Sequence, residues 1–225
     1  MRFLCSFHSG RGLDVIRCFK ANAPTMTLSE VAGASGLPRP TARRILITLQ
    51  QLGYVRTTGQ GFMLTPRVIE LGMAYIGSIN IWDIVRPNLS WLVERTNESS
   101  SIAQLDGSDI VYVARVAVPK LVTLSVTIGT RFPAVSTSLG KVLLAALSPD
   151  ELTRTLAEPS RSGIISRWTP DRAEIDAALL QARERGWAIT DEQLAWGIRS
   201  VATAVRDASG STVAAVNVNA NSGRG

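Results

Sequence analysis

The sequence predicts an α+β protein with an N-terminal winged helix-turn-helix domain, a linker helix and a C-terminal α/β domain that contains an antiparallel sheet. Three observations support this fold class. The formal net charge of +6 lies entirely in residues 1–80. Apolar residues there recur at helical spacing to about residue 52 and then alternate briefly, as in a hairpin. Beyond residue 98, strand-like and helix-like stretches follow one another.

Length and composition exclude several classes of protein. A chain of 225 residues with 45% hydrophobic residues can bury a sizeable core. No apolar run approaches the ~18 residues that a membrane span needs, and the first residues lack the apolar centre of a secretory signal. Cys5 and Cys18 do not suggest a disulfide framework. We therefore expect a cytoplasmic protein with no membrane partner.

The first third has the element order of a helix-turn-helix. Residues 13–22 show one apolar helical face. A second helix is expected after Thr27, which forms a capping-box pattern with Glu30. Gly36 suits a left-handed turn, and two prolines then mark the start of a third helix. In this motif the last helix enters the major groove of DNA by its N-terminal end.

The expected third helix separates an apolar face from a basic one. At 100° per residue, Ala42, Ile45, Leu46 and Leu49 fall on one side and Arg44 falls opposite. Such a helix is often only a solvated surface. The complete element order, together with the local excess of positive charge, instead favours contact with a polyanion.

A hairpin of residues 54–57 and 62–64 would form the wing. Phosphate contacts would set the docking, and base-edge contacts would set the sequence choice. Arg39 and Arg44 are suited to guanine and Thr41 to a thymine methyl group, although the sequence does not decide which of them contacts a base. The candidate DNA-binding residues are Arg39, Pro40, Thr41, Arg43, Arg44, Arg56 and Thr58.

Three stretches, "RGLDVIRCF", "MTLSEVAGASGL" and "TARRILITLQQLGYV", resemble the DNA-binding domain of IclR-type bacterial transcription regulators. With "LTPRVIELGMAY", the similarity is greatest to the branch that controls catabolism of protocatechuate, p-hydroxybenzoate and related aromatic acids. The resemblance extends from about Gly10 to about Asn221. It implies that the second part is a GAF-like effector-binding domain.

A linker helix is expected after the wing, with Thr65 as its cap and Pro66 in its first turn. It either packs on its own domain or, as the resemblance implies and as we favour, joins two domains and helps two chains dimerise. The expected domain boundaries are 9–65 for the DNA-binding domain, 66–80 for the linker and 81–225 for the effector-binding domain. One helical face carries Val68, Leu71, Gly72, Tyr75 and Ile76.

The second part should alternate helices with antiparallel strands. The resemblance implies a further C-terminal helix that covers the sheet, and we expect this chain to lack it. The expected elements are a helix near residues 84–99, a hairpin around Asp106-Gly107, one or two strands within 121–135, a helix at 138–147 closed by Pro149, helices at 150–157 and 171–185, the second ended by Gly186, and a last hairpin around Ser209-Gly210.

Catalytic and metal sites find little support. The single histidine, His8, lies in what looks like a ragged N-terminus, so a serine or cysteine nucleophile would have no base in the second domain. A zinc site lacks Cys and His ligands. Gly140-Lys141 lacks the rest of a phosphate-binding loop, and we interpret Lys141 as a solvated charge. We therefore expect no enzyme, no metal and no cofactor.

The loop before the expected helix at 138–147 is a candidate carboxylate site. Ser136, Thr137 and Ser138 precede an apolar helical run, and the free N–H groups of a helix start attract anions. Hydroxyls in such positions can also be simple N-caps, and this alternative stays open. The resemblance implies that the backbone of Ser138 and Leu139 holds the carboxylate of a small organic acid.

The resemblance places the other half of the pocket on the last hairpin and the loop before it. Asp191, or Thr190 in the neighbouring register, stands where the family has an acidic residue, and Ser200 stands where a thiol is common. Asn217 and Asn219 share one strand face, so they need either a polar ligand or an exposed edge strand. The candidate effector-binding residues, with three apolar wall residues first, are Leu121, Leu124, Phe132, Ser138, Leu139, Asp191, Ser200, Asn217 and Asn219.

These observations predict a DNA-binding transcription regulator that responds to a small carboxylate metabolite of aromatic breakdown. Its expected partners are a roughly palindromic double-stranded operator, that acid, and further copies of the chain in a dimer or tetramer. Two alternatives remain. The second domain could be an oligomerisation scaffold without a ligand, or the chain could be a small-molecule enzyme with an appended helix-turn-helix.

Overall fold

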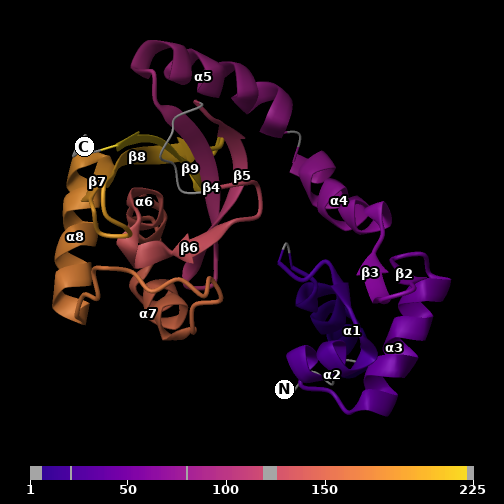
Figure 1. The fold of residues 1–225 in the computed structure, drawn as a ribbon. Helices are drawn as coiled ribbons and strands as arrows, with labels where there is room; N and C mark the ends of the chain where they lie inside the picture. Colours follow the sequence, from indigo (N-terminus) through magenta and orange to yellow (C-terminus); the bar gives the residue numbers. More distant parts are fainter. Residues whose placement is uncertain (1–6, 21, 80, 119–125, 222–225) are drawn as a thin grey trace. The chain divides into compact units, whose positions relative to one another are not determined.

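The computed structural model describes residues 7–20, 22–79, 81–118 and 126–221. The chain divides into two compact units, residues 1–79 and residues 80–225, and Figure 1 shows the elements of each. Among the described residues, no helix is both long and apolar enough to cross a membrane.

The first unit is the predicted winged helix-turn-helix. Its three helices enclose a core that includes Val15, Val31, Leu46 and Val55. The wing pairs in the predicted place, with Val55 opposite Leu64. In chain order the elements are α1 (Phe7–Cys18), β1 (Thr25–Met26), α2 (Leu28–Ser35), α3 (Arg39–Gln51), β2 (Val55–Thr58) and β3 (Gly61–Leu64).

Local signals set the ends of α2 as predicted. The Thr27 hydroxyl accepts a hydrogen bond from the backbone N–H of Glu30, whose carboxylate accepts one from the N–H of Thr27. Gly36 then adopts the left-handed conformation with φ 66°. The first helix was predicted with the wrong ends, because α1 starts earlier and ends earlier than the predicted helix and includes His8. The strand β1 was not predicted, because two residues are too few for a period to be detected.

The segment after the wing is helical, as predicted. It comprises η1 (Pro66–Val68) and α4 (Ile69–Ile79), and the Thr65 hydroxyl accepts a hydrogen bond from the N–H of Arg67. Ile69, Leu71 and Met73 on α4 are all exposed. The described side chains of α4 therefore do not support the alternative in which this helix packs on its own domain.

The second unit is built on one six-stranded antiparallel sheet with the strand order β6-β5-β4-β9-β8-β7. Both predicted hairpins form, and the α+β fold class is confirmed. The strands are β4 (Ser99–Asp106), β5 (Asp109–Val116), β6 (Arg131–Pro133), β7 (Trp187–Asp191), β8 (Ile198–Arg206) and β9 (Thr212–Asn221). The helices are α5 (Ile81–Thr96), η2 (Ala134–Ser136), α6 (Ser138–Ala145), α7 (Pro149–Ala157) and α8 (Arg172–Arg185).

The two faces of the sheet carry different helices. The helix α5 packs on the outer face through Val85 and Leu89. The sheet curls around α6 on the other face, where the main core of this unit lies (Figure 1). A side chain at Gly140 would meet the carbonyl oxygen of Ala134, so α6 sits directly against the preceding turn. Pro149 does not close α6 as predicted; it starts α7, because proline is well tolerated in a first helical turn.

Candidate nucleic-acid interface and binding cavity

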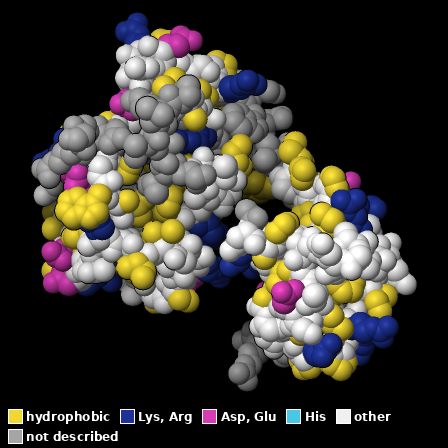
Figure 2. All heavy atoms as spheres, viewed as in Figure 1, with side chains coloured by type: hydrophobic (Ala, Val, Ile, Leu, Met, Phe, Trp, Pro, Cys, Tyr) yellow, Lys and Arg dark blue, Asp and Glu magenta, His cyan; other side chains and the backbone are white. Residues whose placement is uncertain are grey.

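The outer side of α3 carries exposed arginines. Arg39, Arg43 and Arg44 are exposed, whereas Ala42 and Leu46 on the opposite side are buried. Figure 2 shows Lys and Arg side chains along the side of this unit where α3 lies. The amphipathic layout predicted for this helix is therefore present, and its charged groups are free to approach a polyanion.

The remaining predicted contacts differ in how available they are. Pro40 is exposed, and so is Arg56 on β2, whereas Thr41 is half-buried. The Thr58 hydroxyl is already engaged in the wing turn, since it donates to the carbonyl oxygen of Gly61 (3.2 Å) and accepts from the N–H of Gln60 (3.3 Å). Its interaction with DNA would have to compete with these bonds.

Ile47 also lies among the exposed residues of α3, although it is not one of the predicted DNA contacts. The exposed fraction of its side chain is 40%. An apolar side chain here could touch a thymine methyl group. The signal was present in the sequence, since Ile47 falls outside the core-facing stripe.

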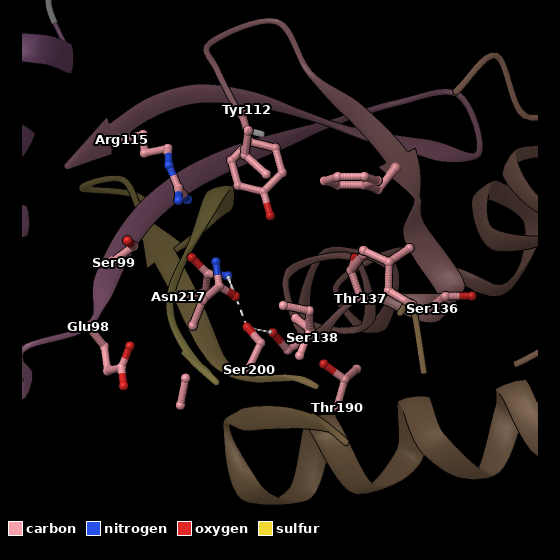
Figure 3. Close-up of a pocket in the computed structure, with 16 residues that line it drawn as sticks. Glu98, Ser99, Tyr112, Arg115, Ser136, Thr137, Ser138, Thr190, Ser200 and Asn217 are labelled. Atoms are coloured by element: carbon pink, nitrogen blue, oxygen red, sulfur yellow. Dashed lines mark hydrogen bonds between the residues drawn. The ribbon is translucent and has the colours of Figure 1, made fainter. Parts of the chain in front are cut away.

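The second unit contains a cavity between the inner face of the sheet and the start of α6 (Figure 3). Apolar walls come from Val126, Phe132, Leu194 and Ile198. Hydroxyl groups from η2 and α6 lie on one side, and polar side chains from β4, β5 and β9 lie on the other. An apolar enclosure with a few converging polar groups is typical of a small-molecule site.

A chain of buried hydrogen bonds joins three elements at this cavity. The hydroxyls of Ser138 and Ser200 share a hydrogen bond of 2.7 Å, and the Asn217 amide donates to Ser200 Oγ (2.9 Å) and to Asn219 Oδ1 (2.9 Å) (Figure 3). Among the described residues, Asn217 Oδ1 has no hydrogen-bond partner although it is buried. This oxygen is an acceptor, so it suits a ligand hydroxyl or a water molecule.

The start of α6 combines a cap with free donors. Thr137 is the N-cap, because its hydroxyl accepts from the N–H of Gly140 (3.0 Å). The Ser136 hydroxyl instead donates to the carbonyl of Trp168 (3.3 Å). The N-cap alternative therefore holds for Thr137 alone. The first-turn amides of Ser138 and Leu139 remain as donors among the described residues, and Leu139 can contribute only its backbone because its side chain lies in the core.

Tyr112 and Arg115 form the other polar side. Tyr112 is buried, and its ring meets that of Phe132 edge-on at 5.9 Å between centroids. Burial raises the pKa of Tyr112 to about 12, against the opposing effects of Arg115 and of the nearby Asn219 and Asn217 side chains. The hydroxyl is thus a protonated donor at neutral pH. Arg115 is half-buried, and its Nη1 donates to Ser101 Oγ (3.0 Å).

The structure places most, but not all, of the predicted effector contacts at this cavity. Phe132, Ser138, Ser200, Asn217 and Asn219 line it. The strand that carries both asparagines lies between β4 and β8, so the edge-strand alternative is wrong. Two further predicted residues, Leu121 and Leu124, lie outside the described residues.

The prediction for Asp191 was wrong. Its side chain is exposed and forms an ion pair with Arg199 (2.7 Å). Successive residues of β7 point to opposite faces of the sheet, so Thr190 is buried and lines the cavity instead. In the fold, Thr190 and not Asp191 therefore faces the cavity.

Lys141 is not the solvated charge that we predicted. Only 6% of its surface is exposed, its ammonium donates to Gln193 Oε1 (2.6 Å), and it lies over the Trp168 ring at 4.7 Å from the centroid. Burial lowers the pKa of Lys141 to about 8. Every residue of α6 is buried, so even its one charge must be held inside the fold.

A winged helix-turn-helix with exposed arginines, followed by a second unit with a mainly apolar cavity that a few polar groups line, defines a two-domain DNA-binding transcription regulator. Comparisons with known proteins identify the family. Residues 10–59 match the IclR helix-turn-helix domain, and residues 73–225 match the C-terminal domain of bacterial transcriptional regulators of the IclR type. The chain belongs to the IclR family, and as a member it is a DNA-binding transcription regulator.

Individual relatives agree with this assignment. The Pca regulon regulatory protein of Pseudomonas putida is 36% identical over 95% of this chain and 74% of its own length. The solved structure of a proposed transcriptional regulator from Rhodococcus sp. RHA1 is 47% identical, covers 97% of this chain and 87% of its own, and superposes with a TM-score of 0.81. An IclR homologue from Microbacterium hydrocarbonoxydans, solved with 4-hydroxybenzoate, has the same fold at 20% identity, with a TM-score of 0.82 over 97% of this chain and 90% of that one.

Proposed function

We propose that this regulator controls an operon for aromatic-acid catabolism and responds to a small carboxylate metabolite that binds in the cavity of the second unit. The main supporting observation is the buried hydrogen-bond chain of Ser138, Ser200 and Asn217, in which no described residue donates a hydrogen bond to Asn217 Oδ1. A buried polar atom without a partner costs about 1–3 kcal/mol, so its presence favours a polar ligand or a bound water there.

The ligand's carboxylate would accept hydrogen bonds from the first-turn amides of Ser138 and Leu139 at the start of α6. Phe132 and the other apolar walls would cover its ring or hydrocarbon body. The Microbacterium structure with 4-hydroxybenzoate and the Pca regulon protein of Pseudomonas support an aromatic-acid pathway, since each is named for such a compound or regulon.

On the DNA side, we propose that the exposed arginines of α3 and the wing contact a roughly palindromic operator. Two recognition helices would read its half-sites, so the chain would act as a dimer or as a pair of dimers. The exposed apolar residues Ile69, Leu71 and Met73 of α4 support self-association through this helix. A cytoplasmic location, beside the DNA, belongs to the same proposal.

Titration with acids tests ligand sensing against the scaffold alternative. A ligand that binds only the folded state raises stability by about 2.7 kcal/mol at one hundred times its Kd, which appears as a rise in thermal midpoint. We expect this rise with at least one of protocatechuate, p-hydroxybenzoate, β-ketoadipate and muconate, together with a change in operator affinity. A midpoint that none of these acids moves would favour the scaffold, and sustained turnover of one of them would favour an enzyme.

Substitution of Arg44 tests the DNA interface. If Arg44 makes a bidentate base contact, we expect Arg44→Ala to weaken operator binding by about 1–3 kcal/mol, measured by fluorescence anisotropy at fixed salt. Arg206→Ala removes an equal charge from an exposed arginine of the second unit and is the matched control. Operator affinity that stays unchanged in Arg39, Arg43 and Arg44 variants would contradict the assignment of α3.

A further inference from the structure

A β-bulge turns Arg115 toward the cavity. In the pairing of β4 with β5, Ile102 lies opposite Ala114 but Ala103 lies opposite Tyr112, so Val113 is an extra residue. In a regular strand, positions 112 and 115 would point to opposite faces of the sheet. Because of the extra residue, both side chains line the cavity, and bulges often re-aim side chains in this way beside functional sites.

Arg115 has a charge and several N–H donors that no described residue engages. A guanidinium offers five N–H donors in a planar fork, and the only hydrogen bond found for this one within the described residues is that from Nη1 to Ser101. No carboxylate among the described residues forms an ion pair with it. Glu98 also lines the cavity, but Figure 3 shows it beyond Ser99, away from the guanidinium.

A half-buried cation without a counter-ion is costly, because it has lost water and gained no opposite charge. Its surroundings do not compensate for the charge. Ser99 and Ser101 are neutral, and so are the two asparagines and the protonated Tyr112 hydroxyl. A planar fork of donors in such a place is the usual recognition group for a carboxylate, which it binds through two parallel hydrogen bonds.

The cavity therefore has two ends that attract negative charge. Arg115 provides a full positive charge on the sheet side, and the first turn of α6 provides free N–H groups and the positive end of a helix dipole on the other side. Figure 3 shows Asn217 and Ser200 between these two ends, and Phe132 is among the apolar residues that also line the cavity. Only a ligand with an anionic group at each end would satisfy both.

We infer that Arg115 binds a second carboxylate of the ligand, so that the cavity selects short dicarboxylic acids over acids with a single carboxylate. This inference rests on the proposed function, because it names the chemical class of the acid that the same cavity receives. Arg115 is thereby assigned a role in ligand specificity.

Matched acids test this selectivity on the full-length protein. Terephthalate and 4-methylbenzoate differ only in whether the ring carries a second carboxylate or a methyl group, and adipate and hexanoate form the corresponding flexible pair. We expect isothermal titration calorimetry to show that one diacid or both bind more tightly than their monoacid partners. The expected ratio is about 10- to 100-fold, the range for hydrogen bonds to a charged group.

Variants of Arg115 then separate its role from general damage. Arg115→Met should remove the preference for the diacid while changing monoacid affinity little, and Arg115→Lys should retain part of it, because lysine keeps the charge without the fork. Arg206→Met removes an equal charge outside the cavity and should leave the preference intact. Thermal midpoints without ligand show whether each variant is folded.

Two results would overturn the inference. These are monoacids that bind the unmodified protein as tightly as the diacids in both pairs, and an Arg115→Met variant that keeps the preference. In each of these cases acids still bind, and the proposed function stands. If none of the acids named in this section or in the preceding one binds the unmodified protein, the proposed function fails and this inference fails with it.

Discussion

The two units of this regulator place their functional groups in opposite environments. In the first unit, the arginines of α3 are exposed and the helix is held by a separate apolar face that includes Ala42 and Leu46. In the second unit, Ser138 and Asn217 are almost completely buried and belong both to the cavity and to the interior of the fold.

This difference determines whether a substitution can change binding without changing stability. Exposed arginines contribute little to stability, so a substitution on α3 should change DNA affinity and leave folding nearly unchanged. A buried hydrogen-bonded group contributes to stability and to ligand recognition together. In the second unit, substitutions that alter ligand binding should therefore also alter the free energy of unfolding. Three predictions test this contrast, in order of decreasing effect.

The largest effect is expected from Gly140→Ala in α6. A Cβ at Gly140 would lie 2.1 Å from the carbonyl oxygen of Ala134, and backbone atoms cannot easily move away. We expect the second unit to lose about 3 kcal/mol or more of unfolding free energy. All five tryptophans lie in this unit, so their fluorescence during urea unfolding reports on it specifically.

Gly33→Ala in α2 is the matched control in the first unit. A Cβ there meets no atom within 4 Å. We expect a gain of about 0.5–1 kcal/mol, because alanine favours a helix more than glycine does. Hydrogen exchange of the α2 amides measures this gain. Equal tolerance of alanine at Gly140 and at Gly33 would contradict the close packing of α6.

The first unit was more fully predictable from the sequence than the second. Its signals are local: the Thr27 capping box, the left-handed Gly36 and the apolar stripe of α3 each lie within one element or turn, and the structure confirms them. Local signals also predicted both hairpins of the second unit. What the sequence missed in the first unit was β1, whose two residues form a strand only because β3 lies beside them.

The cavity could be predicted only in part, because burial and register depend on contacts between distant segments. Lys141 has the sequence context of a surface charge, and only the loop that carries Gln193 shows that it is enclosed. Strict alternation along β5 would place Arg115 on the face opposite Tyr112, and the bulge at Val113 reverses this. The family resemblance supplied Ser200 and Asn217, but it could not supply such side-chain directions.

A smaller effect is expected from Ser200→Ala. The Ser200 hydroxyl bonds to both Ser138 and Asn217, so its loss leaves two buried polar groups with fewer partners. We expect a destabilisation of about 1–3 kcal/mol, measured by tryptophan fluorescence in urea, and less for Ser200→Cys. The exposed Asp191 is the control, because Asp191→Ala should change stability by no more than about 0.5 kcal/mol. Similar losses in both variants would undermine the contrast between buried and exposed groups.

The smallest effect is a pH dependence carried by Lys141. Its pKa in the fold is about 8, below the usual 10.5, so between these values the unfolded chain binds more protons than the folded one. The contribution of Lys141 to the free energy of unfolding therefore rises as pH increases from about 8 to 10.5. Below about pH 8, burial of the charge opposes folding. Relative to Lys141→Met, the unmodified protein should gain on the order of 1 kcal/mol across this interval. Other titrating groups cancel in the difference between the two chains. Urea midpoints that differ by the same amount at pH 7 and pH 10 would show that Lys141 does not titrate in a buried setting.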